Sequence, residues 1–348
     1  MTLLSKPIED SIHQVNVSVV VPTLNEAGFI GNCIRSIRNA VSAARVEIIV
    51  VDNGSRDDTV EIAWREGAIA IVVTGATIAK QRNVGAARAE GELIAFVDAD
   101  CTVSPGWLQA GIQQFRDTNV VSAGASPDPP PDADSWVEQA WCFLKRQPNE
   151  QARRVPWIAS CNLWVRKSTF QQCGGFDESL ETCEDSDLGY RLGDLGDVVS
   201  DPAMAIVHHR EPKTLKQLYR KEIWHGKNSF DGVLRGRFTP SELPSLITPI
   251  LFGGSVIVLV IGFLVALLSD YDAIGSGLMV AGVCGLLMAP SLYTIRAVST
   301  KGNWNRIHHY FMVYLVYFTA RTDAMVRWIV RYLRSRRPKP SADRGKLN

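Results

Sequence analysis

Two aspartates at the end of an apolar run are the residues in this chain best suited to chemistry. The run Leu93–Val97 reads Leu-Ile-Ala-Phe-Val, and Asp98 and Asp100 follow it. An uninterrupted apolar segment of this length predicts a strand that is buried on both faces. If the strand continues through Asp100, both carboxylates point to one side, because side chains alternate along a strand. Two such carboxylates repel each other unless a cation lies between them, and a hard divalent ion fits that need. A polar turn that merely ends the strand is the alternative.

Strands and helices alternate along the first hundred residues, and this order decides where the aspartates lie. Apolar runs predict strands over 17–21, 46–51, 68–73 and 93–97, with helices over 29–43, 59–66 and 79–88 between them. Such alternation predicts a mostly parallel sheet flanked by helices. The carboxyl ends of parallel strands share one edge, so Asn25, Asp52 and Asp98 are expected to meet there in a common site.

Two further groups of residues are candidates for the same site. The acidic cluster Glu184-Asp185-Ser186-Asp187 opens a predicted helix. Ordinary capping explains acids in a first helical turn when they are considered in isolation. His208 follows a predicted strand over 203–207 and could complete an acidic metal site. A surface or packing histidine is the equally weighted alternative.

Composition and motifs exclude several classes of protein. Lys and Arg number 37 and Asp and Glu number 36, so no excess charge indicates a nucleic-acid partner. The chain lacks the glycine patterns of dinucleotide-binding and Walker-type proteins, which argues against a dehydrogenase or an ATPase. Its seven cysteines form no Cys-x-x-Cys pair, which indicates reduced thiols rather than disulfides or a zinc site.

Two uncharged runs, 246–268 and 273–295, predict a transmembrane helical hairpin. Each can cross a hydrocarbon layer of about 30 Å at about 1.5 Å per residue. Basic residues flank the pair on both sides, whereas the link 269–272 has no Lys or Arg. The positive-inside rule then places both flanks in the cytoplasm, which predicts a multi-pass protein of the cell (inner) membrane with a cytoplasmic catalytic domain. The segment 1–15 has no apolar core and is not a signal peptide.

Two other segments are predicted to meet the membrane surface. Residues 213–240 are basic with interleaved aromatics, which favours an amphipathic helix on an anionic leaflet, with a solvated charged face as the alternative. The apolar stretch 310–320 is too short to span alone. We expect 304–333 to lie in the interface; the alternative is a third membrane helix with Arg321 and Asp323 paired inside the bilayer. A basic tail follows over 334–348.

Six motifs, in order, resemble those of family 2 glycosyltransferases over roughly residues 16–230. They are Val-Val-Pro-Thr-Leu-Asn-Glu (20–26), Val-Asp-Asn-Gly-Ser (51–55), Lys-Gln-Arg-Asn-Val-Gly (80–85), Phe-Val-Asp-Ala-Asp (96–100), Gly-Gly-Phe-Asp-Glu (174–178) and Glu-Asp-Ser-Asp-Leu (184–188). The resemblance, to the membrane-attached bacterial type, implies a GT-A fold. It also implies a nucleotide-sugar donor, with a UDP-sugar favoured, a Mg²⁺ or Mn²⁺ ion, and inversion at the anomeric carbon.

The resemblance also implies roles for individual residues. Donor-binding positions are Pro22, Thr23, Glu26, Asp52, Arg82, Asp98 and Ala99. Asp100 and Asp98 would bind the metal with His208 as a third ligand, and Asp185 would be the general base. Glu184, Asp187, Arg220 and Lys221 would support the acceptor. Processive members of the family carry Gln-x-x-Arg-Trp, and here Lys221 stands in place of the tryptophan, which argues against polymer synthesis.

The sequence therefore predicts a GT-A domain over 16–240, followed by two transmembrane helices over 246–295. The predicted activity is that of a metal-dependent, inverting hexosyltransferase-like enzyme acting on a lipid-linked or surface-polysaccharide acceptor. A polyprenyl-phosphate sugar transferase is the alternative within this class, and Arg166, Arg220 or Lys221 would supply its cations. A catalytically silent nucleotide-sugar-binding scaffold is the alternative of another class. A nucleotidyltransferase is disfavoured because a basic glycine-rich loop is missing.

Overall fold

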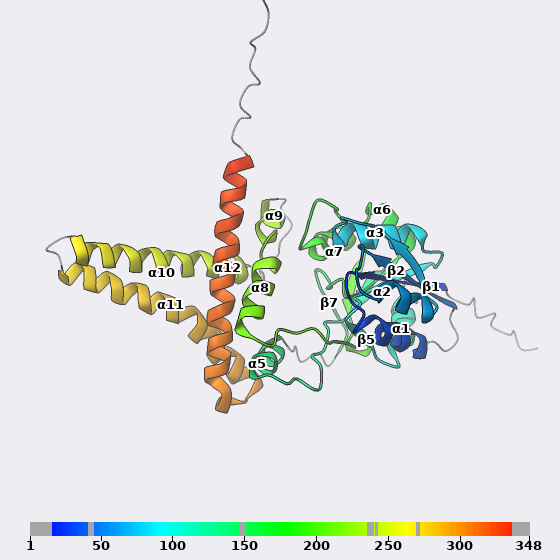
Figure 1. The fold of residues 1–348 in the computed structure, drawn as a ribbon, viewed down its shortest axis with the longest axis horizontal. Helices are drawn as coiled ribbons and strands as arrows, with labels where there is room; N and C mark the ends of the chain where they lie inside the picture. The colour runs from blue at the N-terminus through cyan, green and yellow to red at the C-terminus, as the bar shows by residue number, and fades with distance from the viewer. Residues whose placement is uncertain are drawn as a thin grey trace, which may run out of the picture. The chain divides into compact units, whose positions relative to one another are not determined.

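The computed structural model describes residues 16–40, 45–145, 151–234, 240, 243–268 and 272–335 (Figure 1). These residues form two compact units. Unit 1 takes its residues from 16–128, 151–179 and 184–209, and unit 2 takes them from 129–145, 180–183 and the chain from 210 onward. Several predictions concern segments outside the described residues: the segment 1–15, expected not to be a signal peptide, the end of the first helix (41–43), part of the interface segment (235–239), the hairpin link (269–271) and most of the basic tail (336–348).

Unit 1 is built on an eight-stranded sheet. Its strands are β1 (Asn16–Thr23), β2 (Arg45–Asp52), β3 (Ile69–Val72), β4 (Leu93–Val97), β6 (Val120–Gly124), β7 (Arg153–Arg154), β8 (Asn162–Arg166) and β9 (Asp197–Ser200). They follow the order β3-β2-β1-β4-β8-β6-β9-β7. The first four run parallel, β8 is antiparallel to both neighbours, and β9 is parallel to β6. The mostly parallel sheet predicted from the alternating pattern is confirmed.

Helices cover both faces of this sheet. One layer contains α1 (Ile30–Asn39), α2 (Thr59–Arg65) and α4 (Trp107–Gln114), and the other contains α3 (Ile78–Arg88), α6 (Lys167–Gln172) and α7 (Glu184–Gly193). Neighbouring residues of β1 pack against opposite layers, because side chains alternate along a strand. Val19 lies in the apolar core under the first layer and Val20 in the core under the second. All five residues of β4 are buried, as its apolar sequence predicts.

The strand before Asp98 has the predicted bounds, and the chain turns directly after it. β4 stops at Val97, Ala99 and Asp100 form a turn, and β5 (Cys101–Val103) begins a separate two-stranded sheet with β10 (Ile206–His208). Asp98 and Asp100 are therefore not on one continuous strand, since the chain leaves the main sheet at this point. β10 is shorter than predicted, because Pro202 opens a 3-10 helix, η1 (Pro202–Met204), where a strand was expected.

Unit 2 is helical. It contains α5 (Trp136–Lys145), α8 (Leu215–His225), α9 (Ser229–Leu234), α10 (Leu243–Leu268), α11 (Asp272–Lys301), η3 (Trp304–Arg306) and α12 (Ile307–Ser335). The single helix expected over most of 213–240 is two helices. A capping box formed by Thr214 and Gln217 starts α8, and Gly226 follows its last residue.

Helices α10 and α11 are the two described helices long and apolar enough to cross a membrane. They lie side by side, and glycines allow their backbones to approach closely (Figure 1). A Cβ on Gly282 would lie 2.7 Å from the Leu259 backbone, and one on Gly275 would lie 2.6 Å from the Ala266 nitrogen. Small residues at such contacts are typical of helix pairs in membranes. Large apolar side chains such as Ile257 point outward.

Helix α12 crosses the open end of this hairpin (Figure 1). Its Phe318 ring contacts Phe252 of α10 and Tyr293 of α11, and the Thr322 hydroxyl donates to the Pro249 carbonyl at 3.0 Å. Pro249 lies near the start of α10 and Tyr293 lies in the second half of α11, so both are far from the link between the two helices. Helix α12 is thus attached where the two apolar helices begin and end.

Candidate functional site

The loops that follow β1 and β2 interlock at the carboxyl edge of the sheet. The Asn53 N–H donates to the Thr23 carbonyl at 2.9 Å, and the Asn25 N–H donates to the Ser55 hydroxyl at 2.7 Å. The Glu26 N–H donates to a hydroxyl at the start of α2. This edge thus brings together two of the predicted donor-side segments, 20–26 and 51–55, as expected for adjacent parallel strands.

Asp52 lies inside this edge rather than on it. Its side chain has no exposed surface, and one carboxylate oxygen accepts the N–H groups of Gly54 and Ser55 at 2.8 and 2.7 Å. The other oxygen accepts the Ser55 hydroxyl. Asp52 therefore holds the Asn-Gly turn in shape, where Gly54 has a φ of +80°. Pro22 and Thr23 are likewise buried, whereas Glu26 is partly exposed.

A buried arginine joins the two acidic segments of the sequence. The Arg82 side chain on α3 is 2% exposed, and its guanidinium donates to Asp98 at 2.8 Å and to Glu184 at 2.7 Å. Gly85, one turn further along α3, permits this placement, because a Cβ there would lie 2.3 Å from Val20 of β1. Arg82 thus connects the end of β4 with the first residue of α7.

Asp185 follows directly after Glu184 in the first turn of α7. Burial, followed by the neighbouring Glu184 carboxylate, raises its pKa to about 7, while the Ser186 N–H and Arg82 act in the opposite direction. Part of the side chain stays accessible. A carboxyl group with a pKa near neutrality can accept a proton from a bound hydroxyl at physiological pH.

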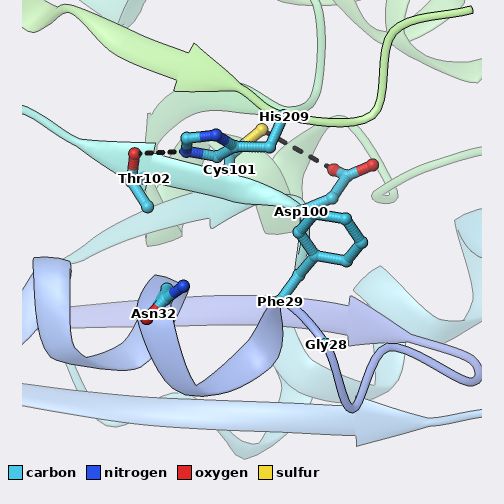
Figure 2. A pocket seen from close by; sticks show the side chains of 7 residues that line it. All are labelled: Gly28, Phe29, Asn32, Asp100, Cys101, Thr102 and His209. Carbon is cyan, nitrogen blue, oxygen red and sulfur yellow. Dashed lines mark hydrogen bonds between the residues drawn. The ribbon is translucent and has the colours of Figure 1, made fainter. Parts of the chain in front are cut away.

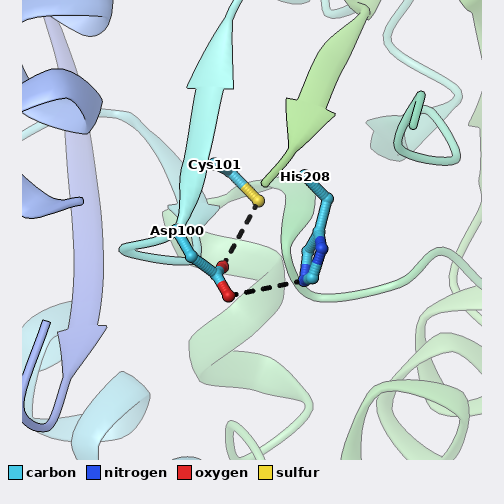
Figure 3. Close-up of side chains that lie close together, drawn as sticks. All are labelled: Asp100, Cys101 and His208. Carbon is cyan, nitrogen blue, oxygen red and sulfur yellow. Dashed lines mark hydrogen bonds and ion pairs between the residues drawn. The ribbon is translucent and has the colours of Figure 1, made fainter. Parts of the chain in front are cut away.

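Asp100 lies in a second cluster, formed with the neighbouring β10 strand. Figure 3 shows Asp100, Cys101 and His208 facing one another, with His208 Nε2 at 3.6 Å from the Asp100 carboxylate. One ligand atom from each of the three lies within 4.8 Å of the others. A hydrogen bond with Cys161 and burial raise the pKa of the Cys101 thiol, so it stays protonated.

A cavity of about 180 Å³ opens beside this cluster. Figure 2 shows Phe29, just before α1, and Asn32 of α1 on one side and His209 on the other, where His209 Nε2 lies 2.8 Å from the Thr102 hydroxyl. Asp100 also lines the cavity. The sequence analysis missed His209, Cys101 and Thr102. The adjacency of His209 to His208 and of Cys101 to Asp100 was the only signal available.

The remaining predicted residues have other partners or lie elsewhere. Asp187 accepts from Arg191 at 2.7 Å, which fixes it within α7. Lys221 of unit 2 pairs with Glu211 at 2.9 Å, whereas Arg220 is exposed on α8. Ala99 is buried in the turn between Asp98 and Asp100. The structure therefore gathers the donor-side residues, Glu184 and Asp185 in unit 1, and it places Arg220 and Lys221 in unit 2.

Comparison with known proteins assigns the family. Residues 18–174 match the family model described as Glycosyl transferase family 2. This part of the chain is a family 2 glycosyltransferase domain. The match spans β1 to the end of α6 and thus includes Asp98, Asp100 and their neighbours, while α7 lies just beyond it.

Several curated relatives resemble more of the chain than the family 2 domain alone. The chain is 28% identical over 254 residues to the glycosyltransferase AglE of Haloferax volcanii, which covers 68% of this chain and 80% of that protein. It is 25% identical over 310 residues to the pre-mycofactocin glycosyltransferase of Mycobacterium tuberculosis, covering 83% of this chain but only 62% of that protein. It is 24% identical over 263 residues to the succinoglycan biosynthesis protein ExoA of Rhizobium meliloti, covering 70% and 79%.

One solved structure agrees with the fold. The mannosyltransferase PcManGT from Pyrobaculum calidifontis, solved in complex with GDP-Man and Mn²⁺, superimposes with a TM-score of 0.59. The two chains are 16% identical, and the match covers 91% of this chain and 88% of that one. The predicted GT-A architecture of the family 2 domain is therefore confirmed.

Removing Arg82 should destabilise the family 2 domain strongly. We expect Arg82→Gln to lower the free energy of unfolding by about 3–5 kcal/mol, because it leaves the buried Glu184 carboxylate without its cation. Arg88→Gln is the matched control on the same helix, since Arg88 pairs with Glu90 at the surface and such pairs contribute little. Thermal unfolding of the purified proteins measures the difference. Equal melting temperatures for the two variants would contradict the bridging role.

Proposed function

We propose that this protein is an inverting glycosyltransferase that moves a sugar from a nucleotide-sugar to the hydroxyl group of a lipid-linked or polysaccharide acceptor at the cytoplasmic face of the cell membrane. One observation carries this proposal. Buried Arg82 joins Asp98, on the donor side, to the start of α7, where Asp185 has a pKa of about 7. A group that meets the leaving diphosphate and a group that can take a proton are thereby held in one site.

The donor side has residues that fit a divalent cation. Asp100 offers an anionic oxygen and His208 a ring nitrogen in the same cluster, while the protonated Cys101 thiol is a poor ligand. We propose that Asp100 and His208 hold Mg²⁺ or Mn²⁺, with Asp98 beside them. When bound, such an ion stabilises the charge that develops on a departing diphosphate. The complex of PcManGT with GDP-Man and Mn²⁺ supports this assignment.

The residues of the chain account for the remaining chemistry. Asp185 accepts the proton of the acceptor hydroxyl, and that oxygen attacks the anomeric carbon from the face opposite the departing diphosphate, which inverts its configuration. Glu184 forms an ion pair with Arg82, so it holds Asp185 in place. Asp52 shapes the turn beneath the nucleotide, and Pro22, Thr23, Glu26 and Ala99 complete the donor pocket.

A hydroxyl acceptor fits these residues better than a lipid phosphate. An ionised phosphate needs no general base, whereas a hydroxyl does, and Asp185 has a pKa suited to that role. The cations considered for a phosphate are mostly engaged: Lys221 pairs with Glu211, and Arg166 donates to the carbonyl groups of Phe115 and Asp117. Exposed Arg220 remains as a group that could meet an acidic headgroup.

We propose that α10 and α11 span the membrane and that α12 lies in the interface. Helix α12 crosses the open end of the hairpin, so a hairpin along the membrane normal sets α12 along the surface (Figure 1). Its charges already have partners on α8: Arg321 pairs with Glu222 at 2.9 Å, and Asp323 accepts the Tyr219 hydroxyl at 2.8 Å. A third span would take these groups into hydrocarbon at high cost.

A donor panel tests the proposed function. Purified protein in lipid or detergent is incubated with UDP-, GDP- and dTDP-sugars and Mn²⁺ or Mg²⁺, with and without an extract of host membrane lipids, and release of nucleoside diphosphate is measured. We expect metal-dependent release from one donor, stimulated by lipid, and we expect Asp185→Asn to abolish transfer while donor binding persists. Donor binding without turnover in the wild type would favour the silent scaffold instead.

The pH dependence of turnover tests the role of Asp185. A base works only when deprotonated, so kcat should fall as pH drops through about 7. Glu184→Gln removes a charge that raises the pKa of Asp185, so the acidic limb should move to lower pH. Asp194→Asn, an exposed acid just after α7, should leave the profile unchanged. Rates measured from pH 5 to 9 check this, and an unshifted limb in Glu184→Gln would argue against the assignment.

His208 should affect the metal requirement. We expect His208→Ala to raise the Mn²⁺ concentration for half-maximal turnover by at least about tenfold, because a coordinating nitrogen is lost. His209→Ala is the matched control, since His209 contacts the Thr102 hydroxyl and lies outside the cluster. Titrations of turnover against Mn²⁺ measure both. Similar shifts in the two variants would mean that His208 has no special role.

A further inference from the structure

Four residues lie directly before α7, the helix that carries the proposed base Asp185, and these four residues cluster with unit 2. Leu180–Cys183 belong to unit 2, whereas the chain on both sides, up to Ser179 and from Glu184 onward, belongs to unit 1. Helix α7, which carries Asp185, begins directly after Cys183. Whatever holds this short segment therefore acts on the start of α7 through the chain itself.

Three contacts tie the segment to the α8–α9 junction. Thr182 is 3% exposed, and its N–H and hydroxyl lie 3.2 and 3.3 Å from Asn228 Oδ1, while the Asn228 N–H donates back to the hydroxyl at 3.2 Å. Glu181 forms an ion pair with Lys227, and the Cys183 thiol lies 4.0 Å from the His225 carbonyl. We call these three contacts the clamp. The reciprocal hydrogen bonds between Thr182 and Asn228 lie at its centre.

The backbone between clamp and base is constrained. Cys183 has a φ of +65°, which a residue with a side chain rarely adopts and which persists only where the surroundings enforce it. The clamp holds the residue before it, and the Arg82–Glu184 pair holds the residue after it. Two anchors from different parts of the chain thus fix the single residue that leads into α7.

We propose that Thr182 and Asn228 are positioning residues for Asp185, an inference that rests on the proposed function. Their hydrogen bonds hold the backbone that leads directly into the first turn of α7, where Asp185 lies.

Paired substitutions test this inference in the full-length protein in lipid nanodiscs. Thr182→Val keeps the shape of a buried side chain but removes the hydroxyl, and Asn228→Ala removes its partner. We expect both to lower kcat between about 10- and 100-fold while the KM for the donor stays unchanged, since misplacing a catalytic group affects the chemical step. Thr182→Ser restores the hydroxyl and should restore kcat. Tyr219→Phe, which removes one hydrogen bond elsewhere in unit 2, should keep the wild-type rate.

Amide hydrogen exchange gives a readout that is independent of turnover. The clamp predicts faster exchange at 184–187 in Thr182→Val and Asn228→Ala, with no change in Tyr219→Phe or Thr182→Ser. Wild-type kcat and unchanged exchange in the first two variants would overturn the inference, as would an equal loss in Tyr219→Phe. If the wild type transfers no sugar, or Asp185→Asn keeps its activity, the proposed function fails, and hydrogen exchange still decides whether the clamp orders α7.

Discussion

The site depends on one buried cation between two carboxylates. Arg82 is almost fully enclosed, so its charge is tolerated only because Asp98 and Glu184 meet it at hydrogen-bond distance. Glu184 lies 102 residues further along the chain. A buried ion pair adds little net stability compared with apolar packing, but it is costly to break, and this pair therefore specifies that α7 docks beside the end of β4. The whole arrangement of donor side and base follows from that requirement.

The same pairing also explains why Asp185 differs from its neighbours. Three carboxylates, Asp98, Glu184 and Asp185, share the one guanidinium of Arg82, and its two donating nitrogens are taken by the first two. Asp185 remains beside a negative charge in an enclosed environment, and its pKa rises to about 7 as a result. A structural ion pair thus leaves the adjacent carboxyl group ready for proton transfer. Asp187, which has its own partner in Arg191, belongs to the framework of the helix.

The pattern of apolar residues predicted most of the helices and strands, because an apolar run forms the surface that an element buries. Strand β4 is buried throughout, and α10 and α11 are long and apolar, as the sequence indicates. The pattern failed where the chain changes direction. The separate strand β5 was not predicted because it pairs with distant β10, and the break after α8 was missed although Gly226 marks it. The bridging position of Arg82 could not be predicted, since no local spacing records a partner 102 residues away.

Each of the two units takes its residues from several separate segments of the chain. Residues 129–145 and 180–183 cluster with helices that follow residue 210, so the chain passes between the units several times before it reaches the hairpin. Composition cannot show this, because the partners of these segments lie far away in the sequence, as in the pairs Thr182–Asn228 and Lys145–Glu211. A catalytic domain that was simply tethered to a membrane anchor would need one connection. One of the crossings lies beside the proposed base, and a fragment cut after residue 209 would lack the partners of Leu180–Cys183.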